Sequence, residues 1–161
     1  MTDLLLLISS ASMQHFKMND NRQYATLDLL LSSMCRYCPT IINAAKRISP
    51  EELEILQLEC RELKKSGETE DVKAYLRANR AFHFSIYRAA RSESLLSIIE
   101  NLWLQIGPYL NLLRGSGNYS VANKHHQTMV DCLWARNENG VRDAVRTDIE
   151  AAYQVLLRLL K

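Results

Sequence analysis

Four polar side chains interrupt the apolar stripes of three predicted helices, and all four could bind a metal ion. Asn79 and His83 stand one helical turn apart, in phase with apolar residues of the same segment. His126 and Asp148 occupy inward positions of two later segments. Burying an imidazole or a carboxylate is costly unless it is paired or bound to a metal. Two imidazoles, a carboxylate and an amide oxygen suit a divalent transition ion such as zinc, nickel or manganese.

A second interpretation of the same residues needs no metal. A histidine on an apolar helix face is often a core residue that is satisfied by hydrogen bonds, and His126 could simply pair with Asp148. His125 also competes with its neighbour for the inward position, because a small change in helix phase would exchange the two. The residues alone leave both interpretations open.

The composition indicates that helices position these residues. The chain has 161 residues, of which 47% are hydrophobic and 24% charged, as in an ordinary globular domain. Five glycines and three prolines are too few for the turns of a β-sandwich or barrel. A formal net charge of +2 is too balanced for a nucleic-acid-binding surface. We therefore expect an all-α protein, an antiparallel helical bundle of six to seven helices.

Six segments of the chain have helical periodicity. They cover about residues 21–47, 50–65, 70–90, 93–114, 121–136 and 141–161. We expect residues 1–20 to form an N-terminal arm or a short helix, and residues 21–161 to form the helical domain. The opening apolar run is too short for a secretory signal or a membrane span, so we expect a cytoplasmic protein.

Several helix ends and bends have local signals. Ser49, Pro50 and Glu52 form the pattern of an N-cap, a first-turn proline and a capping-box glutamate. Pro39 should kink the first helix and Pro108 should bend the fourth, because proline lacks the backbone N–H of the helix ladder.

Four short motifs occur in a fixed order along the chain. They are Arg47-Ile48-Ser49-Pro50-Glu51-Glu52-Leu53, then Asn79-Arg80-Ala81-Phe82-His83 with Ile86 and Ala89, then Leu102-Trp103-Leu104-Gln105-Ile106-Gly107-Pro108-Tyr109, and His126 with Met129, Val130 and Leu133. In this order and spacing they resemble the FCD domain, the C-terminal effector-binding domain of FadR-type GntR transcriptional regulators. The resemblance covers about residues 24–160.

The resemblance implies an all-α domain that senses a small organic acid, in many members through a bound metal. The family pattern has Asp-x-x-Phe-His on one helix, a second His at the start of another, and a last His twenty-two residues after the second. The Asp and first His of this pattern correspond to Asn79 and His83, and the second and last His to His126 and Asp148. One carboxylate is therefore lost at Asn79 and another appears at Asp148. His83, His126 and Asp148 could still hold an ion, with Asn79 as a weak fourth ligand. A changed or absent ion is the alternative.

The resemblance also implies a homodimer that contacts DNA through an N-terminal winged helix, and residues 1–23 are too short to supply that fold. Tyr87, Gln105 and Tyr109 are candidate contacts for a small carboxylic acid effector, because they stand at or beside inward positions. The leading hypothesis is an effector-sensing and dimerisation domain of a transcriptional regulator, without catalytic residues. A metal-dependent helical-bundle enzyme and a plain helical oligomerisation module are the alternatives.

Overall fold

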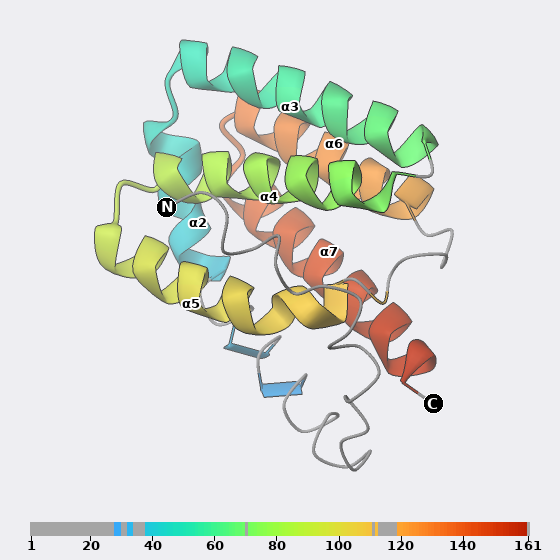
Figure 1. Ribbon diagram of the computed structural model, residues 1–161. Coiled ribbons are helices and arrows are strands. Elements are labelled where there is room, and N and C mark those ends of the chain that lie inside the picture. The colour runs from blue at the N-terminus through green and yellow to red at the C-terminus, as the bar shows by residue number, and fades with distance from the viewer. Residues whose placement is uncertain are drawn as a thin grey trace, which may run out of the picture.

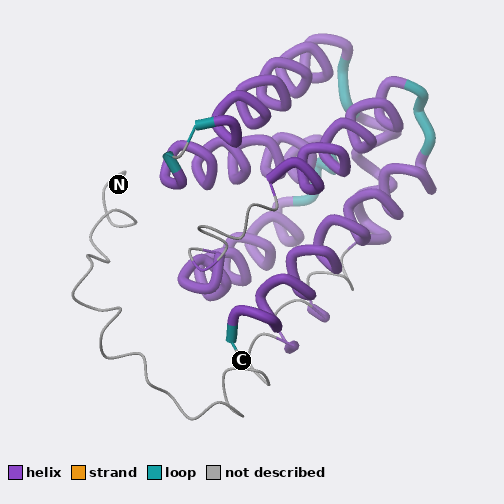
Figure 2. The backbone as a smooth tube through the Cα atoms, turned by 90° about the vertical axis from the view of Figure 1, so that its right-hand side faces the viewer, coloured by secondary structure: helices purple, strands orange, loops and turns teal. Residues whose placement is uncertain are grey.

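All regular secondary structure in the described part of the chain is helical. The computed structural model describes residues 28–29, 32–33, 38–69, 71–110, 112 and 119–160. Its main elements are α2 (Cys38–Arg47), α3 (Pro50–Glu68), α4 (Val72–Ala89), α5 (Glu93–Leu110), α6 (Tyr119–Trp134) and α7 (Glu138–Leu159). Figure 1 shows them packed as a bundle, and Figure 2 shows the short loops between several of them. The predicted all-α bundle is confirmed, whereas the predicted arm over residues 1–20 lies outside the described residues.

The core lies where the apolar faces of the helices meet. On α3 the buried side chains are Leu53, Leu56, Cys60 and Leu63, which recur every three or four residues and so share one face. This face packs against α4 and α6, while α7 packs against α2 and α6. Three helices of this core, α4, α6 and α7, carry the polar residues singled out from the sequence.

The predicted start of α3 is confirmed, and its predicted end is wrong. The Ser49 hydroxyl accepts a hydrogen bond from the Glu52 backbone N–H at 3.2 Å, and the Glu52 carboxylate accepts one from the Ser49 backbone N–H at 2.9 Å. The helix was expected to end near residue 65, but it continues to Glu68. The Ser66 hydroxyl donates back to the Leu63 carbonyl at 2.9 Å and is therefore accommodated in the last turns.

Arginine side chains bind helix C-termini at one end of the bundle. Arg47 Nη1 donates to the carbonyl oxygen of Ala90, which caps the C-terminus of α4, at 2.9 Å. Arg136 Nη1 donates to the carbonyl oxygens of Ala45 and Ile48, at the C-terminal end of α2, at 3.0 and 2.7 Å. A cation at a helix C-terminus also interacts favourably with the helix dipole.

Two arginines adopt a backbone conformation that usually favours glycine. Arg91 follows α4, Arg136 follows α6, and both have a φ of 54°. The Arg91 side chain also reaches both carboxylate oxygens of Glu52 at 2.8 Å, which ties the end of α4 to the start of α3. These contacts show that α3 and α4 run antiparallel.

The last helix begins one turn earlier than its apolar pattern predicts. The pattern placed its start at residue 141, whereas α7 begins at Glu138. The Asn137 side chain accepts a hydrogen bond from the Gly140 backbone N–H at 2.9 Å, so Asn137 is the N-cap.

The two prolines lie close to described helix ends. Pro39 stands in the first turn of α2 as described, so the kink predicted at this residue falls at the edge of the described residues. Pro108 stands in the last turn of α5, which continues to Leu110. None of the helices in the described ranges combines the length and the hydropathy that a membrane crossing requires.

Candidate metal centre

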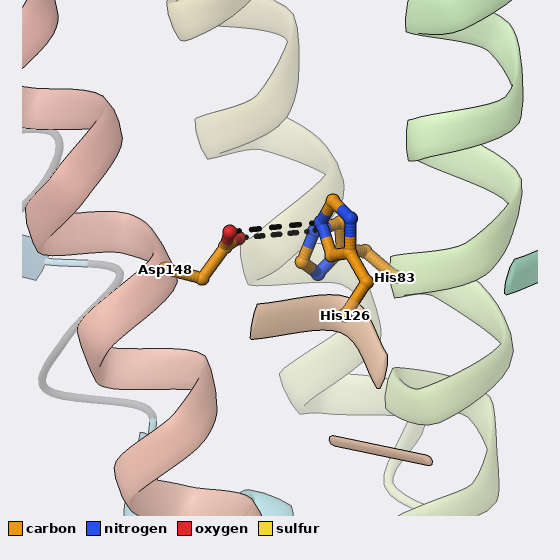
Figure 3. Close-up of side chains that lie close together, drawn as sticks. All are labelled: His83, His126 and Asp148. Atoms are coloured by element: carbon orange, nitrogen blue, oxygen red, sulfur yellow. Dashed lines mark hydrogen bonds and ion pairs between the residues drawn. The ribbon is translucent and has the colours of Figure 1, made fainter. Parts of the chain in front are cut away.

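His83, His126 and Asp148 meet in the interior of the bundle, although they come from three different helices. His83 lies on α4, His126 on α6 and Asp148 on α7. Figure 3 shows the carboxylate of Asp148 directed at the two imidazole rings. Each residue lies on the buried face of its helix, among neighbours such as Ile86, Met129 and Val145. The helical phases that the sequence predicted therefore bring these three side chains together.

The ligand-type atoms of the three residues face one another. The two Nε2 atoms of His83 and His126 lie 3.2 Å apart. His83 Nε2 lies 3.3 Å from Asp148 Oδ2, and His126 Nε2 lies 3.6 Å from Asp148 Oδ1. The three residues thus form a small triangle with two nitrogen corners and one carboxylate corner.

The triangle is shielded from solvent and is formally anionic when both imidazoles are neutral. His83 is 3% exposed and His126 is 1% exposed, whereas the Asp148 side chain is 13% exposed. Burial lowers the pKa of His126 below its ordinary value, and this effect exceeds the opposing effect of Asp148. Burial acts to raise the pKa of Asp148, but hydrogen bonds from His126 and His83 place it well below its usual range. A neutral His126 and an ionised Asp148 are the forms that bind a metal.

The dimensions of the triangle fit a coordinated ion. Zinc bonds to nitrogen and oxygen ligands are about 2.0–2.2 Å long, so neighbouring ligand atoms in a tetrahedral shell lie about 3.4 Å apart. The three measured separations of 3.2, 3.3 and 3.6 Å lie close to that value. The buried carboxylate of Asp148 also carries a negative charge that a divalent cation would compensate.

The outer nitrogen of each ring departs from the usual pattern of metal sites. A metal-bound histidine commonly donates its other ring N–H to a carboxylate or a carbonyl, which fixes the ring. Within the described chain, the Nδ1 atoms of both His83 and His126 are buried without a hydrogen-bond partner. Packing against Phe82 orients the rings instead, with ring centroids 5.5 Å from His83 and 5.0 Å from His126.

The structure resolves the choice between the adjacent histidines of α6. His126 is the inward residue, whereas His125 is only half-buried. Asn79 lies one turn before His83 on α4 and is half-buried. Its side chain makes no hydrogen bond to another described residue, and its role as a fourth ligand stays a prediction.

The three candidate effector contacts have different surroundings. Tyr87 is buried, and its ring stacks on His83 with centroids 6.1 Å apart and an interplanar angle of 28°. Tyr109 is buried on α5. Gln105, expected at or beside an inward position, is exposed, and its side chain donates along its own helix to the Asn101 carbonyl at 3.3 Å. The structure therefore does not bring Gln105 to the triangle, because the inward position of that turn belongs to Ile106.

The sequence did not predict that aromatic side chains contact the imidazoles of the triangle. Trp103 on α5 lies with its ring centroid 5.7 Å from that of His83, and Phe82 touches both imidazoles. Both residues stand in the motifs quoted above, but an aromatic residue on an apolar helix looks like any other core residue. The only available signal was the position of Phe82 immediately before His83.

Comparisons with known proteins agree with this architecture. The family model of the FCD domain matches residues 39–151. The HTH-type transcriptional regulator McbR of Escherichia coli strain K12 is 26% identical over 118 residues, which cover 69% of this chain and 53% of that protein. The chain thus spans about half the length of this curated relative.

Two solved structures have the same fold. E. coli McbR/YncC superposes with a TM-score of 0.74 at 23% identity, covering 82% of this chain and 68% of that one. The metal-free FCD domain of TM0439 superposes with a TM-score of 0.66 at 17% identity, covering 89% of this chain and 96% of that one. At these identities the likeness establishes the fold alone.

Proposed function

Because the chain belongs to the FCD domain family, we propose that it is the effector-sensing and dimerisation domain of a transcriptional regulator. The model match spans residues 39–151, which include all three residues of the triangle. FCD domains of regulators are not enzymes, so membership argues for binding and against the metal-dependent enzyme weighed from the sequence. The proposed role is to convert the binding of a small molecule into a change of the protein's conformational equilibrium.

His83, His126 and Asp148 are proposed to hold a divalent transition ion, either zinc, nickel or manganese. The observation that carries this proposal is the meeting of two Nε2 atoms and a carboxylate, from three helices, within 4.8 Å of one another. Three protein ligands leave coordination positions open, as in zinc sites that bind a further molecule. Asn79, one turn from His83, is the proposed weak fourth ligand.

The proposed effector is a small carboxylic acid. A bound ion would supply positive charge and an open position for one carboxylate oxygen of the effector. Tyr87 is proposed to contact the effector because it stacks on His83, and Tyr109 remains a candidate of the same kind. The surroundings of Gln105 lend no support to a contact from that residue.

The partners of the domain are proposals that follow from the family. A homodimer is expected, and DNA would be contacted by a winged-helix domain of the whole regulator rather than by this domain. Effector binding would then bias the relative orientation of two such winged helices across the dimer. A regulator of this kind would act in the cytoplasm.

Elemental analysis with matched variants tests the metal site. The purified chain is stripped with a chelator, reloaded with zinc and analysed for bound metal. We expect about one zinc ion per chain, and loss of that ion in the His83→Ala and His126→Ala variants. His125→Ala is the matched control, because His125 adjoins His126 but does not belong to the triangle, and it should retain the ion.

A thermal-shift screen of small carboxylic acids tests effector sensing. Acids that bind should raise the melting temperature of the zinc-loaded protein and leave that of the His83→Ala variant unchanged. If the histidine variants keep their metal, the triangle is not the site. If no zinc binds and no acid stabilises the protein, a plain helical oligomerisation module is the better description.

A further inference from the structure

Aromatic rings surround His83 of the triangle, and one of them also contacts His126. Within the described chain, the ring contacts of His83 include Phe82 at 5.5 Å, Tyr87 at 6.1 Å and Trp103 at 5.7 Å between centroids. Phe82 contacts His126 as well, at 5.0 Å. These separations fall in the range in which aromatic pairs attract each other through offset or edge-to-face contacts. The surroundings of the two imidazoles are thus largely apolar.

Trp103 differs from the other rings in its exposure. Phe82 is fully buried and Tyr87 is 3% exposed, whereas Trp103 is only half-buried. Its ring lies edge-on to Phe84, with centroids 5.3 Å apart, and Phe84 is fully buried. Phe84 therefore fixes the indole beside His83 while part of the indole surface stays available.

Trp103 also lies on α5, which packs against fewer helices than the three helices that carry the triangle. The helices α4, α6 and α7 pack extensively against α2, α3 or each other, whereas the packing of α5 is mainly against α4. The helix α5 contributes Trp103, together with the buried residues Leu95, Ile99, Ile106 and Tyr109. Of the three aromatic side chains in contact with His83, that of Trp103 is thus supplied by α5 and retains exposed surface.

We propose that the effector is a monocarboxylic acid with a planar aromatic ring, and that Trp103 is the residue that selects this ring. The inference rests on the proposed function, since the carboxylate is assigned to the ion held by His83, His126 and Asp148. The aromatic body of the effector would then lie against the indole, as a further ring in the series formed by Phe84, Trp103 and His83.

The chemistry of this environment disfavours polar effectors. Aromatic faces and edges accept few hydrogen bonds, so a polyhydroxylated acid would exchange hydrogen bonds to water for contacts that cannot replace them. An aromatic ring has no hydrogen bonds to water of this kind to lose when it leaves the solvent. It gains aromatic contacts and buried apolar area instead. A single carboxylate is also all that one open metal position requires.

Calorimetric titration of the zinc-loaded full chain with phenylacetate, malate and gluconate tests the proposal. We expect phenylacetate to bind at least about tenfold more tightly than either polar acid. In the Trp134→Phe background Trp103 is the only remaining tryptophan of the two in the chain. Phenylacetate should therefore change the emission of Trp103 directly, and the chelated, zinc-free protein should show no such change.

Variants at position 103 distinguish the effect of an aromatic ring on binding from the effect of side-chain size. Trp103→Leu should weaken phenylacetate binding by roughly threefold to tenfold, the usual worth of an aromatic pair, and leave malate binding unchanged. Trp103→Phe keeps a ring and should retain most of the preference. Trp134→Leu is the matched control, because Trp134 is 48% exposed at the end of α6 and should leave every affinity unchanged. Circular dichroism and zinc content confirm that each variant is folded and loaded.

The outcomes distinguish this inference from the proposed function. If zinc and acids bind but phenylacetate has no advantage, or Trp103→Leu keeps the advantage, the ring selection by Trp103 is overturned and the metal-dependent sensor stands. If the triangle takes up no zinc, the proposed metal site fails, and the ring selection that rests on it fails too.

Discussion

Arg136 Nη1 lies 2.7 Å from the carbonyl oxygen of Ile48, so a side chain from the end of α6 caps the end of α2. The same nitrogen donates to the Ala45 carbonyl at 3.0 Å. The helices α2 and α6 are separated by α3, α4 and α5 along the chain, and this contact joins their C-terminal ends. It stabilises the end of the bundle at which α7 also begins.

Removing this guanidinium should destabilise the protein. Arg136→Ala should lower the free energy of unfolding by about 1–3 kcal/mol, because two partly buried carbonyl groups lose a charged donor. Arg136→Gly should cost somewhat less, since glycine accepts the φ of 54° without strain. Urea denaturation measures both. The control is Arg146→Ala, because the Arg146 side chain is 63% exposed and its loss should change the free energy of unfolding by under about 0.5 kcal/mol. Equal urea midpoints for Arg136→Ala and Arg146→Ala would contradict the capping role.

The capping box of α3 should have a measurable effect on stability. Ser49→Ala removes the hydroxyl that accepts the Glu52 N–H, and should lower the free energy of unfolding by about 1 kcal/mol. Ser66→Ala is the control on the same helix, because its hydroxyl only adds a bond to a carbonyl within the helix, and it should be nearly neutral. Thermal or urea unfolding measures the stability of both variants. A larger loss of stability in Ser66→Ala than in Ser49→Ala would contradict the role of Ser49 as the N-cap.

Zinc affinity should depend on the chemical nature of residue 148. Asp148→Asn keeps the shape of the side chain but removes its charge, so the affinity should fall by roughly 100-fold or more. Asp148→His supplies a third imidazole, as in the family pattern, and should retain most of the affinity. Competition with a chromophoric chelator measures both constants. Asp143→Asn, on the same helix but paired with Arg142, serves as the control and should bind as the wild type does.

The stability of the metal-free protein should fall as the pH is lowered from 7.5 towards 5.5. Burial depresses the pKa of His126, so between the folded and unfolded values the unfolded chain binds more protons than the folded one. Stability is therefore lost as the pH falls through the unfolded value of about 6.5. The depressed pKa of Asp148 adds a further loss only at more acid pH, below about 4.

Unfolding in the presence of a chelator at several pH values measures this dependence. His126→Gln cannot take up the proton and should flatten the slope between pH 7.5 and 5.5. His125→Gln should leave the slope as it is. If the free energy of unfolding of His126→Gln still falls between pH 7.5 and 5.5 as it does in the wild type, a group other than His126 causes the pH dependence.

Much of the fold followed from helical periodicity and cap residues. The stripes on α4 and α7 place His83 and Asp148 on an interior side, whereas on α6 the sequence leaves His125 as an alternative to His126. The structure brings His83, His126 and Asp148 together. Their capacity to bind a metal stays a prediction. The contact of Gln105 with an effector also stays a prediction, and its side chain is exposed beside the buried Ile106. The helix α5 is apolar over so much of its surface that the sequence defines its buried face poorly.

Other features depend on contacts that no local pattern contains. The left-handed conformations of Arg91 and Arg136 occur where glycine or asparagine is usually expected, so nothing at those positions signals them. Long-range hydrogen bonds, from Arg91 to Glu52 and from Arg136 to Ile48, accompany them. Trp103 likewise gains significance only through its position beside His83 in the folded chain.

The order of the three triangle residues along the chain has a consequence for biosynthesis. His83 and His126 emerge from the ribosome before Asp148, which lies on α7, the last of the three helices to be made. A nascent chain that stops short of α7 holds both imidazoles but lacks the carboxylate that completes the cluster. Binding of the proposed ion by all three residues would therefore follow the synthesis of α7.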